Sequence, residues 1–275
     1  MAGNDHASPT TIHGVEPAAD NCRPSQAGES RDVSHPLGAG TQPGTNTRDG
    51  GASRSPLWGS PEWQADRRSK LGASQFAAAL NLSTHATAHD IWAVAVGERE
   101  ADPETPAMRH GTLLEPIIGE EYARATGHKI RLRSRETLTH PDHPWLVATP
   151  DAEVIGDGSV ADYGLQIKGV GIHAAGRWGE SDTDDVPPAV AVQVMIELGV
   201  ARACGLRWAK QDIACWTWGR PLKVLVVEWD EDFYAELFER GRAFWFDHVL
   251  ARVPPPLDGS DSAWEFLRRR YPREE

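Results

Sequence analysis

Three short segments of the sequence carry side chains that could act together in one reaction. Glu115 lies in an amphipathic segment, and Asp151 follows an apolar one. Gln166 and Lys168 lie in the next apolar segment along the chain. A Gly-Asp-Gly turn separates Asp151 from Gln166, so a hairpin would bring these two side chains to the same end of a sheet. Gln166 and Lys168 are two residues apart in an expected strand and therefore face the same side.

This set of side chains has the chemistry that hydrolysis of a phosphodiester requires. Carboxylate and amide oxygens are hard ligands for Mg²⁺, which polarises a phosphate and lowers the pKa of an attacking water. A lysine ammonium would orient that water or stabilise the charge that builds on phosphorus. Each residue alone also has a structural interpretation: a turn for Asp151, a solvated helix face for Glu115 and a strand edge for Lys168. The prediction therefore depends on their combination.

The periodicity of apolar residues predicts the elements that must position these side chains. Helices are expected over 73–80, 88–96, 106–126, 188–203 and 230–251, where apolar residues recur at helical spacing. Strands are expected over 129–139, 145–149, 152–155, 163–170, 210–218 and 221–229. This order predicts an α/β fold with a central mixed sheet flanked by helices.

Composition sets limits on the class of protein. The chain has 275 residues, of which 40% are hydrophobic, and residues 1–55 are rich in Gly, Pro, Ser and Thr without apolar periodicity. We expect a disordered leader over 1–55 and one folded domain over 56–275. Three cysteines without CxxC spacing argue against a disulfide framework and against a structural zinc site. No membrane-spanning run or signal peptide is apparent, so a cytoplasmic location is expected.

The net charge of −12 argues against binding to nucleic acid. Proteins that bind DNA usually present a basic surface, because contacts with phosphates supply much of their affinity. However, a metal-dependent nuclease gathers carboxylates at its site, and net charge does not exclude a local basic groove.

Several segments, in order, resemble the lambda-exonuclease and YqaJ-like phage recombination nucleases of the PD-(D/E)xK superfamily. TPDAEV at 149–154 is similar to the T/S-P-D-G segment of that family, and GTLLEP at 111–116 is similar to its GxxLEP helix. LQIKGV at 165–170 occupies the place of its LEIK strand. Trp63 to Arg67 with GAS at 72–74, and Gln193-Val194, resemble its WxxxR…GAS and AQVQ segments. The likeness covers about residues 58–275.

The resemblance implies a restriction-endonuclease-like core with a metal site. Carried over position by position, it implies that Glu115, Asp151 and Gln166 line a site for Mg²⁺ or Mn²⁺. The backbone carbonyl of Ile167 would complete this site, and Lys168 would be the catalytic ammonium. Two further positions depart from the family, because Gln166 replaces its second acid and Met195 replaces the second Gln of AQVQ. The first departure removes one of three formal negative charges.

The resemblance also implies residues that contact the substrate. Arg67, Ser74 and Thr149 would contact a DNA phosphate, and Gln193 would approach the scissile bond. The structural alternatives are a helix cap for Ser74 and a buried amide for Gln193. His140 and His143 could suggest another metal site, but the HPDHP sequence around them is typical of a turn.

The function that these implications favour is a metal-dependent DNA exonuclease that acts on duplex ends in phage-type recombination. Two alternatives stay open: a catalytically weakened protein that binds DNA ends, and a structure-selective or restriction-type endonuclease on the same scaffold. The resemblance implies DNA as substrate and a single-strand annealing protein as partner, and it leaves a homo-oligomer open.

Overall fold

A five-stranded mixed sheet supports the predicted site. The computed structural model describes residue 66 and residues 68–133, 136–156 and 161–257. The strand order is β2-β5-β6-β7-β8. The strands are β2 (Lys129–Leu132), β5 (Ala152–Ile155), β6 (Ala161–Val170), β7 (Lys210–Thr217) and β8 (Lys223–Glu228). β6 and β7 pair in parallel, and the other neighbours pair antiparallel.

A second, smaller sheet has the order β1-β4-β3. It consists of β1 (Leu71–Gly72), β3 (Leu138–Thr139) and β4 (Leu146–Ala148). β1 and β4 run parallel, with Leu71 beside Leu146. The carboxyl ends of the two strands therefore lie at the same edge of this sheet, and the residues that follow them are close together.

Helix α4 (Pro106–Thr126) covers one face of the large sheet. Thr105 caps its first turn by accepting a hydrogen bond from the Met108 N–H, and Gly127 ends it with φ 75°. Ile118 and Tyr122 are buried against strand residues, namely Ala152, Val154, Leu165, Ile167 and Ala214. The odd-numbered residues of β6 in this group thus point towards α4, and the even-numbered residues point the other way.

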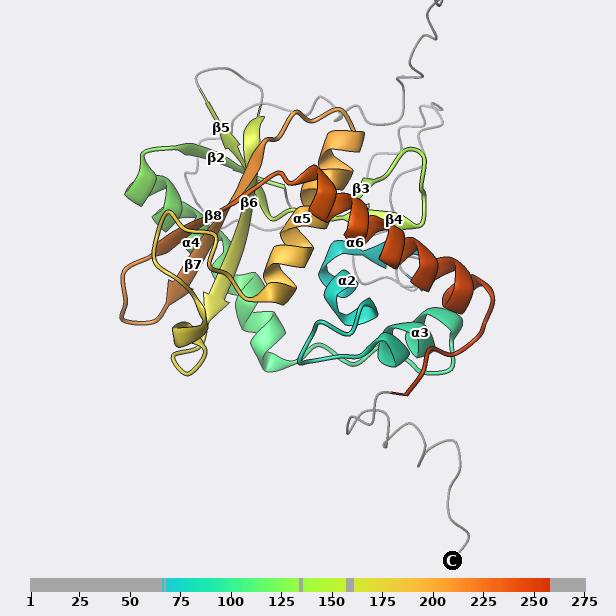
Figure 1. Cartoon of the computed structure of the whole chain (residues 1–275). Coiled ribbons are helices and arrows are strands. Elements are labelled where there is room, and N and C mark those ends of the chain that lie inside the picture. Colours follow the sequence, from blue (N-terminus) through green and yellow to red (C-terminus); the bar gives the residue numbers. More distant parts are fainter. Residues whose placement is uncertain (1–65, 67, 134–135, 157–160, 258–275) are drawn as a thin grey trace, which may run out of the picture. The chain divides into compact units, whose positions relative to one another are not determined.

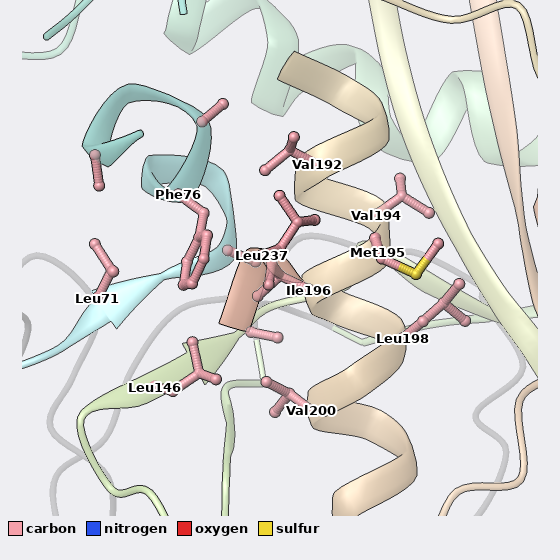
Figure 2. Packing of buried hydrophobic residues seen from close by; sticks show 14 of the residues in the cluster. Leu71, Phe76, Leu146, Val192, Val194, Met195, Ile196, Leu198, Val200 and Leu237 are labelled. Carbon is pink, nitrogen blue, oxygen red and sulfur yellow. The ribbon is translucent and has the colours of Figure 1, made fainter. Parts of the chain in front are cut away.

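Helix α5 (Pro188–Ala203) packs on the opposite face, as Figure 1 shows. Its residues from 194 to 201 are all buried, which is typical of a helix in the middle of a core. Around it pack α2 (Ala73–Ala79), α3 (Ala88–Val96) and α6 (Glu231–Ala243). Figure 2 shows Phe76 of α2 and Leu146 of β4 in one apolar cluster with side chains of α5. The packing is close: a Cβ at Gly241 would lie 2.0 Å from Cζ of Phe76.

Most predicted elements occur where periodicity predicted them. The predicted helices 88–96, 106–126 and 188–203 match α3, α4 and α5 residue for residue. The predicted helix 230–251 is present, but its last part, Phe244–Leu250, is π-helical, and η1 (Ala175–Arg177) is a short 3₁₀ turn. The predicted single strand 129–139 is wrong, because its residues divide between β2 of the large sheet and β3 of the small one. The expectation of a leader over 1–55 lies outside the described residues.

Two arginines bind one buried acid near the point where the strand divides. Arg131 and Arg133 both bind the carboxylate of Glu153, which is only 1% exposed. The N–H of Arg133 donates to the carbonyl of Asp151 at 3.0 Å. These bonds hold residue 133 beside the start of β5, beyond the last ladder pair of β2, Leu132 with Ala152.

No helix in the described part of the chain is long and apolar enough to cross a membrane.

Candidate functional site

The hairpin of β5 and β6 brings Asp151 beside Gln166. Ala152 pairs with Leu165 in the antiparallel ladder, so Asp151 lies opposite Gln166 at the end of the pairing. The Gln166 amide donates from Nε2 to Oδ2 of Asp151 at 2.5 Å. The N–H of Ile167 donates to the same oxygen at 2.8 Å. The Asp151 carboxylate is therefore held in place by two neighbouring residues of β6.

Gln166 has a polar atom that the described residues do not satisfy. The side chain is 3% exposed, and its Oε1 is buried without a hydrogen-bond partner among them. A buried acceptor left unpaired typically costs about 1–3 kcal/mol. A flip of this amide would turn Oε1 towards Asp151, and a bound cation would then find two oxygen donors.

Lys168 begins a chain of polar side chains that runs into α5. Its ammonium donates from Nζ to Oε1 of Gln193 at 3.1 Å. Gln193 donates from Nε2 to Oε1 of Glu197 at 2.8 Å. Gln211 of β7 donates from Nε2 to Oε2 of Glu197 at 2.6 Å. Lys168 and Gln193, both predicted from the sequence, are thus in direct contact, whereas Glu197 and Gln211 were not predicted.

Glu197 is an unusual residue because it is an acid that is 1% exposed. Burial, and to a smaller extent the negative charge of Asp151, raise its pKa from 4.5 to about 8. Hydrogen bonds from Gln193 and Gln211 and the positive charge of Lys168 act in the opposite direction. One sequence signal could have revealed it: Glu197 is a single charge in the apolar run 194–201, four residues after Gln193.

Glu115 approaches the sheet from the other side. It is half-buried on α4, next to Leu114. A Cβ at Gly169 of β6 would lie 3.7 Å from Cδ1 of Leu114, so this turn of α4 packs over the end of β6 that follows Lys168. The side chains of Gln166 and Lys168 point to the α5 face. Glu115 therefore lies on α4 near the same end of β6. Helix α4 covers the face of the sheet opposite to the one that Gln166 and Lys168 point to.

The predicted phosphate contacts lie at one end of the small sheet. Ser74 is exposed in the first turn of α2, directly after β1, and Thr149 follows β4. The Thr149 hydroxyl lies 3.2 Å from that of Thr137. Gly72 is the N-cap of α2, which excludes the alternative in which Ser74 caps this helix. Arg67 lies outside the described residues.

The described residues hold no cluster of three or more His, Cys, Asp or Glu placed for a metal ion. The predicted site has two carboxylates, Glu115 and Asp151, and would draw its other oxygens from an amide and a carbonyl. At the HPDHP sequence, the N–H of Asp142 donates to Nδ1 of His140 at 3.2 Å, as in a turn. The rings of His140 and His143 lie near Phe238 of α6, which fits a packing role.

Comparisons with known proteins agree with the resemblance in the sequence. The YqaJ-like viral recombinase domain family matches residues 62–204. The uncharacterized protein YqaJ of Bacillus subtilis (strain 168) is 28% identical over 211 residues, which are 76% of this chain and 63% of that protein. The match thus spans less than two thirds of the length of this relative.

Solved structures share the fold. The crystal structure of an alkaline exonuclease (LHK-Exo) from Laribacter hongkongensis has a TM-score of 0.54 and 21% identity. The structure of LHK-Exo in complex with dAMP has a TM-score of 0.55 and 22% identity. Each match covers 77% of this chain and 97% of that one. The expected fold class, a restriction-endonuclease-like core with a central mixed sheet flanked by helices, is confirmed.

Proposed function

The chain belongs to the YqaJ-like viral recombinase domain family, and on that premise we propose that it is a metal-dependent deoxyribonuclease acting on the ends of duplex DNA. The observation that carries the proposal is the arrangement on β5 and β6. There, the Asp151 carboxylate accepts hydrogen bonds from Gln166 and Ile167, one residue before the Lys168 ammonium. The likeness in fold to an exonuclease that was crystallised with dAMP supports a nucleotide substrate.

The proposed ligands have the oxygen chemistry that a hard divalent cation, Mg²⁺ or Mn²⁺, requires. Asp151 and Glu115 would supply carboxylates, and Gln166 would supply its buried Oε1, which has no hydrogen-bond partner among the described residues. The carbonyl of Ile167 would supply a further oxygen. When bound, the metal would polarise the scissile phosphate and lower the pKa of a water molecule.

The other residues of the site would bind and orient the substrate. The Lys168 ammonium, held at Gln193, would donate hydrogen bonds to a phosphate oxygen or to the attacking water. The hydroxyls of Ser74 and Thr149, together with Arg67, would bind a neighbouring DNA phosphate. Because Thr149 is two residues before Asp151, a phosphate held there would lie near the metal site.

One observation favours a second function, a weakened protein that binds DNA ends without cleaving them. Gln166 stands where the family has an acid, so the site has two carboxylates, and the amide is bonded to one of them. A carbonyl oxygen brings no charge, and hard cations are held mainly by carboxylates. This function keeps the fold and the phosphate contacts but not the hydrolysis.

The proposed setting is phage-type recombination, with two associations: a single-strand annealing protein as partner, and a second copy of the chain. We expect the annealing protein to receive the single strand that digestion of one strand of the duplex would expose. Co-purification of the two proteins, and light scattering of the chain alone, would test these two associations.

One assay with three substrates tests the main proposal. Linear and closed-circular duplexes, each linear one with or without a 5′-phosphate, are incubated with Mg²⁺, Mn²⁺ or EDTA. We expect metal-dependent loss of the linear substrates only. Cleavage of the circle would indicate the endonuclease alternative. Binding without cleavage at any metal concentration would indicate the weakened binder.

A further inference from the structure

Glu197 is a buried acid to which the resemblance assigns no role. It lies on α5 between Ile196 and Leu198, both fully buried. A buried carboxylate is costly unless hydrogen bonds satisfy it. Here each oxygen accepts one amide: Oε1 from Gln193 and Oε2 from Gln211. Because both oxygens are engaged by side chains, the geometry favours a role in orienting those side chains over direct contact with substrate.

The hydrogen bond to Glu197 determines which atom Gln193 presents to Lys168. A glutamine amide has an acceptor oxygen on one side and a donor nitrogen on the other. With Nε2 donating to Glu197, Oε1 faces the Lys168 ammonium at 3.1 Å. The flipped amide would place its NH₂ group against an ammonium, and two donors would face each other. An acceptor oxygen at 197, on the carboxylate or on the neutral acid, therefore selects the orientation that binds the lysine.

A glycine on β6 makes room for the other hydrogen bond. Gly164 is the ladder partner of Gln211. A Cβ at Gly164 would lie 3.0 Å from Cδ of Gln211 and 2.7 Å from Cζ3 of Trp208. Glycine at this position therefore leaves space for the Gln211 amide to reach Glu197. Residues from β6, β7 and α5 thus join in one chain of hydrogen bonds that ends at Lys168.

We propose that Glu197 is a positioning residue that acts through Gln193 to hold the ammonium of Lys168 at the site. The importance of that ammonium for cleavage rests on the proposed nuclease function. The effect of Glu197 on the position of the ammonium does not depend on that function. Glu197→Leu removes the acceptor, whereas Glu197→Gln keeps a side chain of the same shape with one acceptor oxygen. In Glu197→Gln, that oxygen can still accept from Gln193, while a flipped Gln211 amide accepts from the new NH₂ group.

The first measurement follows the lysine directly. The chain has five lysines, so protein labelled with ¹³C at lysine Cε gives few resonances, and Lys168→Arg identifies that of Lys168. We expect Glu197→Leu and Gln193→Leu to shift the Lys168 resonance and to leave that of exposed Lys129 unchanged. Glu197→Gln should restore most of the wild-type shift. Ile196→Val, a core change on the same helix, is the matched control and should leave the Lys168 resonance in place.

The second measurement is kinetic and separates orientation from binding. Loss of an interaction that matters only in the transition state lowers kcat with little change in KM. We expect Glu197→Leu to lower kcat about 10-fold or more, with KM for DNA within about 3-fold of wild type. The double variant with Gln193→Leu should be no slower than Gln193→Leu alone, because both changes break one chain.

The outcomes distinguish this proposal from the proposed function. If wild type cleaves no DNA with any metal, the nuclease function fails, and the NMR comparison still decides the role of Glu197. If Glu197→Leu does not fold, Glu197→Met, which also lacks an acceptor oxygen, takes its place, and Gln193→Leu shows how far the resonance moves when the bond to Lys168 itself is lost. A Lys168 resonance that stays in place in the folded Glu197 variant would overturn the proposal, even if activity falls.

Discussion

The amide of Gln166 donates to the carboxylate of Asp151 across 2.5 Å, and the backbone N–H of Ile167 donates to the same oxygen. An acid at position 166 could not make this bond, because two carboxylates at that distance repel each other unless a proton or a cation lies between them. The glutamine therefore allows the two strands to meet without a metal. The same substitution lowers the negative charge available to hold one.

Lys168→Ala tests the basic member of the site. The ammonium would stabilise charge that develops mainly in the transition state, so we expect cleavage to fall about 100-fold or more while the fold is retained. Lys129→Ala, which removes an exposed lysine from β2, is the control and should cleave as wild type does. Cleavage by Lys168→Ala within tenfold of wild type would remove Lys168 from the mechanism.

Stability should depend on pH through Glu197. Its pKa is raised from 4.5 to about 8 in the folded protein, so between these values the folded state holds a proton that the unfolded state has released. Stability from this group is therefore present at low pH and is lost as pH rises towards 8. Each pKa unit corresponds to about 1.4 kcal/mol, which gives a loss of up to about 4 kcal/mol between pH 5 and 8.

The measurement is urea unfolding of wild type and Glu197→Gln at several pH values without metal. The Gln variant cannot lose this proton, whereas Asp151 and Lys168, the charged groups that act on Glu197, are present in both proteins. The stability of wild type relative to the variant should therefore decrease as pH rises. Parallel pH profiles of stability for the two proteins would show that the pKa of Glu197 is not raised in the folded protein.

Local patterns in the sequence predicted the parts of the site that depend on local geometry. The β5–β6 hairpin follows from alternating residues on either side of a glycine-containing turn, and this alone brings Asp151 to Gln166. Helix α4 follows from its apolar spacing, from Pro106 at its start and from Gly127 at its end. These signals lie within a few residues of the structure they determine.

The parts that were not predicted depend on contacts between distant segments. Glu197 and Gln211 meet only because α5 packs across β7, and the charge pattern of one helix does not show what covers it. Likewise, Arg133, just after the last residue of β2, binds Glu153, 20 residues away. Apolar periodicity carries no information about such partners.

A chain of residues 56–275 should fold and cleave as the full chain does. The composition of residues 1–55 motivates this expectation, since a segment without apolar periodicity adds little to a core. Circular dichroism and the linear-DNA assay on both chains provide the measurement. A truncated chain that is insoluble, or that is folded but inactive, would show that residues 1–55 complete the core or the site.

Gln166→Glu should strengthen metal binding, because it adds a third carboxylate at nearly the same volume. Glu115 and Asp151 alone should hold Mg²⁺ weakly, so wild type should need about millimolar metal or prefer Mn²⁺. We expect Gln166→Glu to lower the metal concentration for half-maximal cleavage and to raise the rate at limiting Mg²⁺. In the metal-free protein it should also lower the melting temperature, since it replaces the bond to Asp151 with a repulsion, and added Mg²⁺ should reverse that loss.

The control for this prediction is Gln75→Glu, which adds the same charge on α2 at a position where the side chain accepts a hydrogen bond from the Gly72 N–H. That variant should leave the metal titration unchanged, because its new charge lies on a helix cap and not beside Asp151. If wild type is inactive at every metal concentration and Gln166→Glu gains activity, the chain is the weakened binder. If the titrations of wild type and Gln166→Glu superimpose, residue 166 is not a ligand, and the metal site lies elsewhere.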